Sequence, residues 1–234
     1  MPLTAVLIPG LVSDARVWRP LARALPDAVA LHDADLRAMT SITGAAERLL
    51  SLIDGDLLLA GHSMGGRIAQ EMARIAPDRM RGLILANTGH NSRREGEEPK
   101  RQAMIELGHS GMDRLTDQWL PPMLDPARTD DAALVADLRA MVLAATPDQH
   151  ERQIRALLDR PDAMPHLGAI PCPVLLLTGR QDGWSPAAQH QEMADRIPDA
   201  ELALIDNAGH FAPVERPEAV VAAAMDWITR KVPA

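Results

Sequence analysis

Ser63 lies at the centre of a Gly-x-Ser-x-Gly motif that runs from Gly61 to Gly65. An apolar run ends just before the motif and a helical pattern starts just after it, which predicts a tight turn between a strand and a helix. The two glycines remove the Cβ atoms that would clash in such a turn. Because a serine hydroxyl is a weak nucleophile until a base accepts its proton, the motif requires a histidine and an orienting acid elsewhere in the chain.

Two later residues fit these roles. Asp182 follows the apolar run 174–177, and His210 follows the run 202–205. The order Ser63, Asp182, His210 is typical of a nucleophile on a strand-to-helix turn. We expect His210 to accept the Ser63 proton and pass it to the leaving group, while Asp182 holds the imidazole in the correct tautomer.

Other readings of these residues exist. Asp182 could be a solvated loop carboxylate, and Asp206 is a rival acid at the end of a strand, four residues before His210. Of the eight histidines, only His210 follows both Ser63 and Asp182 and also lies past the last predicted strand. His62 is next to Ser63, but neighbours on a sharp turn point apart, so we expect it to pack behind the site.

A tetrahedral intermediate also needs hydrogen-bond donors for its oxyanion. We expect one from the backbone N–H of Met64, directly after the nucleophile at the start of the helix. We expect the second from the N–H of Leu11, in the loop after the first apolar run. Losing one such donor typically costs about 3 kcal/mol of transition-state stabilisation.

The composition limits the class of protein. The 234 residues suit one domain, or one domain with an insertion, and 47% are hydrophobic. A net charge of −8 argues against nucleic acid or an anionic membrane as a partner. Cys172 is the only cysteine, and residues 1–10 lack the pattern of a signal peptide. We therefore expect a cytoplasmic protein, a monomer or small homo-oligomer, that uses neither metal nor cofactor, because the histidines lack metal-ligand spacing and the reacting groups are all protein groups.

Short apolar runs without alternation predict buried strands of a parallel sheet, and helical patterns separate them. The runs are 5–8, 28–31, 57–60, 83–86, 174–177 and 202–205, and the clearest helical patterns are 64–75, 188–197 and 217–230.

Residues 90–168 interrupt this alternation. The segment 92–101 is highly charged and is expected to form a mobile entrance. Thr129 is predicted to cap one helix, and Thr146 begins a capping box followed by proline that predicts another. We expect a helical cap inserted between two strands.

Several motifs together resemble the α/β-hydrolase superfamily, in particular a small, capped, esterase- or lactonase-like member. They are PGL at 9–11, DLR at 35–37, GHSMGG at 61–66, TGRQDGWSP at 178–186 and NAGHFAPVERPE at 207–218. The resemblance implies an α/β fold in three layers, with a mostly parallel sheet of about six strands flanked by helices. The core would be 1–89 and 169–234, and the cap 90–168. The chain departs from the family where Pro9 replaces a frequent histidine, which leaves the Leu11 N–H in place.

These residues predict a serine hydrolase, similar to a carboxylesterase, that cleaves a small, mostly apolar ester or lactone through an acyl-serine intermediate. Trp184, Phe211 and Trp119 are candidates for contact with substrate. The clusters 93–94 and 100–101 could recognise a carboxylate or form a solvated face. Two alternatives stay open: a carbon–carbon bond hydrolase or lyase acting on a carboxylate-bearing substrate, and a non-catalytic small-molecule receptor. A buried arginine near Ser63 would favour a substrate that is an acid.

Overall fold

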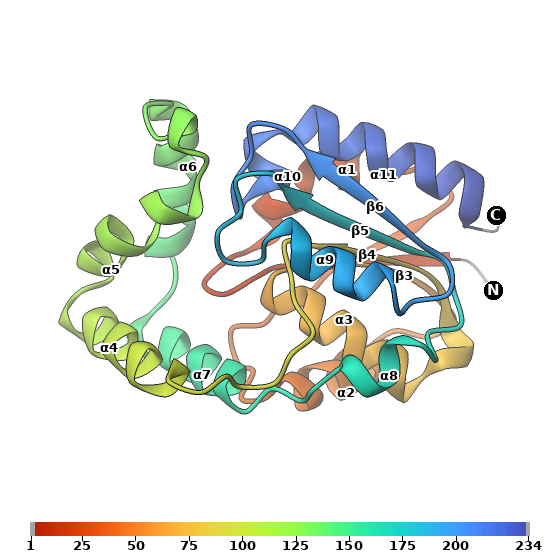
Figure 1. The fold of residues 1–234 in the computed structure, drawn as a ribbon, viewed down its shortest axis with the longest axis horizontal. Helices are drawn as coiled ribbons and strands as arrows, with labels where there is room; N and C mark the ends of the chain where they lie inside the picture. Colours follow the sequence, from red (N-terminus) through yellow and green to blue (C-terminus); the bar gives the residue numbers. More distant parts are fainter. Residues whose placement is uncertain (1–2, 233–234) are drawn as a thin grey trace.

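A six-stranded sheet forms the centre of the computed structural model, which describes residues 3–232 (Figure 1). Every strand pair is parallel, and the spatial order is β2-β1-β3-β4-β5-β6. All six predicted strands and the predicted fold class are confirmed. The strands are β1 (Leu3–Ile8), β2 (Ala30–Asp33), β3 (Asp56–His62), β4 (Met80–Ala86), β5 (Val174–Gly179) and β6 (Ala200–Ile205).

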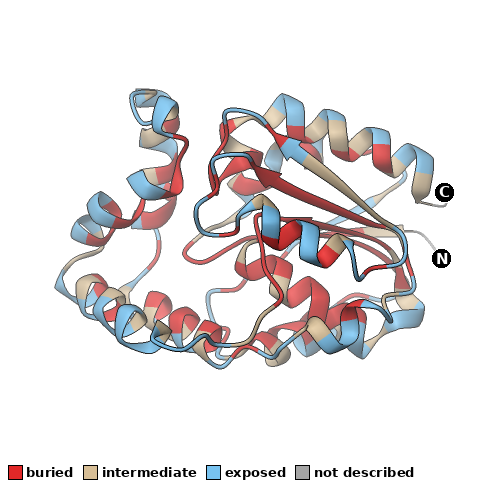
Figure 2. Cartoon of the chain, viewed as in Figure 1, coloured by how far each residue is buried: buried red, intermediate tan, exposed pale blue. Residues whose placement is uncertain are grey.

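The interior strands explain why the apolar runs lack alternation. Strands β1, β3, β4 and β5 are almost entirely buried, since helices cover both faces of the sheet. The edge strands differ, because β2 is mostly exposed and β6 is only partly buried. Figure 2 shows this contrast between the buried interior and the exposed outer surfaces.

Two helices, α1 and α11, cover one face of the sheet, and α2, α3 and α9 cover the other (Figure 1). The predicted helix at 64–75 is confirmed as α3, and the last two predicted helices are confirmed with small shifts of their ends. The helices outside the segment between β4 and β5 are α1 (Arg19–Ala24), α2 (Ile42–Leu52), α3 (Met64–Ile75), α9 (Ala187–Ala194), α10 (Ala212–Glu215) and α11 (Pro217–Lys231). Two 3-10 turns, η1 (Ala15–Val17) and η2 (Pro77–Arg79), accompany them.

Strand order places a crevice at the carboxyl ends of β1 and β3. These strands are neighbours, but the chain leaves β1 toward β2 on one side and leaves β3 toward β4 on the other. The loops that follow them therefore diverge, and ligands of parallel α/β sheets bind at such points. Ser63 and Leu11 both lie in these two loops.

The segment between β4 and β5 is helical and contains no strand among its residues, all of which the structure describes. Figure 1 shows α4, α5 and α6 in an arc beyond the carboxyl ends of the strands, with α7 completing the arc beneath. The elements are α4 (Glu97–Ser110), α5 (Met112–Trp119), η3 (Pro121–Met123), η4 (Pro126–Arg128), α6 (Ala132–Leu143), α7 (Pro147–Leu158) and α8 (Met164–Leu167).

Two expectations about this segment need correction. Thr129 does not cap α6, because its backbone is helical and its hydroxyl donates to the Pro126 carbonyl. Asp131 is the cap instead, and its carboxylate accepts from the N–H of Leu134 (3.1 Å). The charged stretch expected to be a mobile entrance is helical from Glu97 onward. The Thr146 cap is confirmed, with its hydroxyl oxygen accepting from the N–H of Gln149 (3.1 Å).

One further observation concerns membranes. Within residues 3–232, no helix combines the length and the apolar character needed to cross a bilayer.

Candidate active site

The turn between β3 and α3 holds Ser63 in a strained backbone conformation, with φ 53° and ψ −113°. A positive φ is uncommon for a residue other than glycine, and such strain often occurs at functional sites. Close packing explains the flanking glycines. A Cβ on Gly65 would lie 2.2 Å from the Ile8 carbonyl oxygen, and one on Gly61 would lie 2.5 Å from that of Gly65. The Ser63 N–H donates to the Ala86 carbonyl (2.9 Å), which ties the turn to β4.

The structure brings Ser63, His210 and Asp182 together. His210 Nε2 lies 2.9 Å from Ser63 Oγ, and His210 Nδ1 lies 2.9 Å from Asp182 Oδ2. An ionised carboxylate only accepts hydrogen bonds, so the hydrogen is assigned to Nδ1. Nε2 is then free to accept from the Ser63 hydroxyl, which is the arrangement that general-base activation of a serine requires.

Asp182 is buried, and both of its carboxylate oxygens accept hydrogen bonds. Its Oδ1 accepts from the N–H groups of Trp184 (2.8 Å) and Ser185 (2.9 Å). Burial alone would raise the pKa of the Asp182 carboxyl. His210 and the hydrogen bonds to the carboxylate outweigh burial and lower that pKa well below its ordinary value. Asp182 is therefore ionised at neutral pH and available to stabilise a charged imidazole.

Asn87 is a member of this network that the sequence analysis missed. It is fully buried at the end of β4 with φ 49°, and its amide Nδ2 donates to Asp182 Oδ2 (2.9 Å) and to the Gly209 carbonyl (3.1 Å). Asn87 thus fixes both the acid and the loop before His210. A polar residue at the end of an apolar run, between the strands of the nucleophile and of the acid, was the available signal.

Glu215 was also missed, and it holds the His210 loop from behind. Its buried carboxylate accepts from the N–H groups of Gly209 (2.9 Å), Phe211 (3.1 Å) and Asp125 (2.8 Å). Burial raises the pKa of Glu215. The His210 N–H donates to the Met123 carbonyl (2.6 Å). The histidine loop is therefore hydrogen-bonded to the segment between α5 and α6.

The two expected oxyanion donors flank the serine. The N–H of Met64 begins α3, and the N–H of Leu11 lies in the loop after β1. Within residues 3–232, neither group donates a hydrogen bond to another part of the chain. The next residue, Val12, donates its N–H to Gln153 of α7 (2.9 Å), which steadies the loop. Gln153 is a third residue that the sequence analysis did not identify.

His62 packs behind the site, as expected. Its Nε2 donates to the His210 carbonyl (2.7 Å), and its ring lies 5.3 Å from that of Phe211, centre to centre. Burial, and next the neighbouring His210, lower the pKa of His62 to about 3. His62 is therefore neutral near pH 7 and supports the histidine loop without adding charge.

A cavity of about 530 Å³ opens beside Ser63 and His210. All three aromatic residues expected to contact substrate line it: Trp184 is 44% exposed, whereas Trp119 and Phe211 are buried and meet edge to face. The lining is partly apolar and partly charged. Its apolar members include Leu11, Met64, Met104, Met123, Ile154 and Leu157.

Residues 5–224 match the alpha/beta hydrolase family. The chain belongs to this family. Among solved structures of alpha/beta hydrolases and their relatives, a thermophilic esterase from Thermogutta terrifontis, with malate bound, superposes with a TM-score of 0.91 and 27% identity. That match covers 97% of this chain and 90% of the other.

Two curated relatives extend the comparison of this alpha/beta hydrolase. The pimeloyl-[acyl-carrier protein] methyl ester esterase of Nitrosomonas europaea is 26% identical, over 92% of this chain and 92% of its own length. Polyketide synthase ThaQ of Burkholderia thailandensis is 28% identical over 95% of this chain, which spans only 12% of that much longer protein. Esterases are thus among the full-length relatives of the chain.

Proposed function

We propose that the protein is a serine hydrolase that cleaves a small carboxylic ester or lactone through an acyl-Ser63 intermediate. The observation that carries this proposal is the continuous hydrogen-bond path from Ser63 Oγ through His210 to Asp182, with both links at 2.9 Å. Relatives named as esterases support the same reaction class. In this proposal α4–α7 form a cap, and the cavity beneath them holds the substrate.

The first half of the reaction transfers the acyl group to the serine. As Ser63 Oγ attacks the carbonyl carbon, His210 Nε2 accepts the hydroxyl proton. The carbonyl oxygen becomes an oxyanion, which accepts hydrogen bonds from the N–H groups of Leu11 and Met64. The carbon–oxygen bond to the leaving alcohol then breaks, and protonated His210 donates its proton to the alcohol oxygen.

The second half returns the free enzyme. Water donates a proton to His210 Nε2 while its oxygen attacks the acyl carbon, and the same two N–H groups hold the oxyanion. The bond to Ser63 Oγ breaks, the proton returns to the serine, and the carboxylic acid leaves. Asp182 stabilises the charged imidazole in both halves. The chain supplies the proton acceptor, the oxyanion donors and the first nucleophile, and water is the second nucleophile.

Short-chain p-nitrophenyl esters and a fluorophosphonate probe test this proposal. The wild-type protein should release p-nitrophenol and become labelled on Ser63, whereas Ser63→Ala should do neither. Turnover that survives in Ser63→Ala would overturn the assignment of the nucleophile. A properly folded wild-type protein that shows neither turnover nor labelling would instead point to a small-molecule receptor on this fold.

A second candidate is a carbon–carbon bond hydrolase or lyase that acts on a carboxylate-bearing substrate. One observation favours it: Arg67 lines the same cavity as Ser63. Such an enzyme would cleave a vinylogous diketone acid much faster than any simple ester of the same size. The relative kcat/KM of these two substrates separates the candidates.

A further inference from the structure

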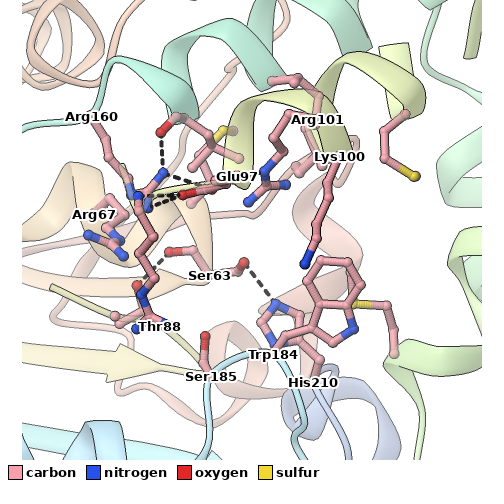
Figure 3. A pocket seen from close by; sticks show the side chains of 18 of the residues that line it. Ser63, Arg67, Thr88, Glu97, Lys100, Arg101, Arg160, Trp184, Ser185 and His210 are labelled. Atoms are coloured by element: carbon pink, nitrogen blue, oxygen red, sulfur yellow. Dashed lines mark hydrogen bonds and ion pairs between the residues drawn. The ribbon is translucent and has the colours of Figure 1, made fainter. Parts of the chain in front are cut away.

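The charge of the cavity is opposite to that of the chain. The whole protein has a net charge of −8, yet five cationic side chains line the cavity beside Ser63, against two acidic ones, Glu95 and Glu97. We call the five the cationic wall; Figure 3 shows four of them around Ser63. The cationic wall consists of Arg67, Arg94, Lys100, Arg101 and Arg160.

Two members of the cationic wall share one counter-ion within the protein. Glu97 pairs with Arg160 (2.7 Å) and with Arg101 (3.2 Å). Arg160 is buried and also donates to the carbonyls of Asn91 (2.9 Å) and Ser92 (2.8 Å). Burial raises the pKa of Glu97, but the hydrogen bonds from Arg160 outweigh it and bring that pKa to about 2. Arg160 and Arg101 therefore each have an ion-pair partner within the fold, although the one carboxylate of Glu97 leaves the three groups with a net charge of about +1.

Arg67 is different. It lies on α3, four residues after Ser63, which is about 6 Å along a helix axis. Its only side-chain hydrogen bond within residues 3–232 runs from Nη1 to the Asn91 carbonyl (2.6 Å). No acid of the described chain is within ion-pair distance of it. Burial, and next the charge of Arg160, lower the pKa of Arg67 to about 9, so it is still charged at neutral pH.

Lys100 adds a second uncompensated charge from another element. It extends from α4 into the cavity toward Trp184 (Figure 3). Among the described residues it has no ion-pair partner, and the same holds for the exposed Arg94 at the rim. A largely desolvated guanidinium without a counter-ion is unfavourable. A bound anion would remove that penalty.

We propose that Arg67, assisted by Lys100, binds a carboxylate of the substrate, so that the preferred substrate is a monoester of a short dicarboxylic acid. This inference rests on the proposed function. The guanidinium matches a carboxylate through paired N–H groups, and charge-assisted hydrogen bonds of this kind are the strong ones. The rise of about 6 Å between Ser63 and Arg67 along α3 corresponds to a few methylene groups between the two carboxyl carbons. Apolar side chains are among those that line the cavity.

A matched pair of substrates tests the inference. Mono-p-nitrophenyl glutarate carries the free carboxylate, and methyl p-nitrophenyl glutarate has the same chain without the charge. For the wild-type protein, kcat/KM should be at least about tenfold higher for the monoester, as one charge-assisted hydrogen bond would give. The preference should fall as salt is added.

Variants locate the effect on Arg67. Arg67→Met should bring the preference close to one, Arg67→Lys should keep part of it, and Lys100→Met should lower it by a smaller factor. Arg196→Met removes an exposed charge outside the cavity lining and should keep the wild-type preference. Glutarate should inhibit hydrolysis of the neutral diester in the wild type and far less in Arg67→Met.

The outcomes separate this inference from the proposed function. Equal kcat/KM for the two substrates in the wild type, or a preference that survives in Arg67→Met, would overturn the carboxylate site. Ser63-dependent hydrolysis of the neutral diester would still support the proposed function in either case. If Arg67→Met lowered the two rates by the same factor, Arg67 would act on Ser63 and not on the substrate, which would also overturn the inference. Lys100 is exposed, so Lys100→Met should fold and its effect on the substrate preference can be measured even if Arg67→Met does not fold.

Discussion

The two sides of the cavity differ in how far their charged groups are paired within the chain. Around His210 and Asp182, the acid accepts from backbone N–H groups and from Asn87, and the histidine loop is held by Glu215. On the cationic wall, Arg160 and Arg101 have a counter-ion, whereas Arg67 and Lys100 have none within residues 3–232. In the proposed mechanism, the polar groups that act on the reaction are preorganised by the chain. Polar groups that lack partners are the ones available to a ligand.

Mutations on the two sides should therefore change the kinetics of different substrates in different ways. A satisfied network fixes geometry, so its loss should affect every substrate alike. An unsatisfied charge selects among substrates, so its loss should change their ranking.

The largest expected effect is on the triad side. Asp182→Asn would leave His210 without its carboxylate, and kcat should fall by about 10⁴-fold. The fall should be the same for the glutarate monoester and its neutral diester, because Asp182 does not touch the substrate. Steady-state kinetics with both substrates measures this. A loss confined to one substrate would contradict the separation of the two sides.

Arg160 and Arg67 form a pair within one wall that sharpens the comparison. Arg160→Met breaks a buried ion pair and should destabilise the protein by about 3 kcal/mol. Arg67→Met removes an uncompensated charge, so the free energy of unfolding should stay the same or rise. Urea unfolding of both variants, with Arg196→Met as a control for net charge, measures the difference. Equal destabilisation by the two variants would mean that Arg67 serves the fold as Arg160 does.

Glu215 tests whether the histidine loop depends on the carboxylate behind it. Glu215→Gln replaces one accepting oxygen with an amide NH₂ group, which faces at least one backbone N–H. We expect a loss of about 2 kcal/mol in unfolding free energy and a lower kcat for both glutarate substrates. The exposed Glu218→Gln is the matched control. Wild-type kcat in a destabilised Glu215→Gln would show that the loop keeps its position without the carboxylate.

The last prediction has no expected effect on activity at neutral pH and concerns buried histidines outside the proposed reaction. Burial is the main cause that lowers the pKa of His150 to about 4 and of His190 to about 4. The unfolded chain takes up protons near pH 6.5 while the folded protein does not, so stability should fall as pH drops from about 6.5 toward 4. Each histidine contributes up to about 1.4 kcal/mol per pH unit in that range.

His150→Gln checks this pH dependence. It should make the urea midpoint less sensitive to pH between 6.5 and 4 by about the share of one histidine. The exposed His166→Gln provides the control. An unchanged slope in His150→Gln would show that folding does not shift the pKa of His150.

The sequence was sufficient for those parts of the site that depend on chain order. Ser63, Asp182 and His210 each follow a predicted strand, and parallel strands bring their carboxyl ends to one edge of the sheet. The six strands were predictable because their apolar runs are buried on both faces. The three residues meet in the structure, and their catalytic roles stay predictions.

Residues that act across the chain could not be predicted in this way. Asn87, Gln153 and Glu215 bind groups 90 or more residues away, or a loop whose path depends on the whole fold. Nothing in the local pattern distinguishes Arg67, which lacks a counter-ion, from Arg160, which has one. The cap of α6 was predicted at Thr129 and lies at Asp131 for a related reason. A cap depends on backbone angles that both residue types can adopt.

The hydrogen bonds between the histidine loop and residues 123–125 have a consequence for protein engineering. Exchanging the whole segment between β4 and β5 for one from a relative would replace the backbone that carries the Met123 carbonyl and the Asp125 N–H. His210 and Glu215 would then keep these partners only where the new backbone follows the same path. A chimera that replaces only residues outside 121–126 keeps both contacts. In this chain, therefore, the boundary between the residues that can be exchanged freely and those that hold the His210 loop lies inside the segment between β4 and β5.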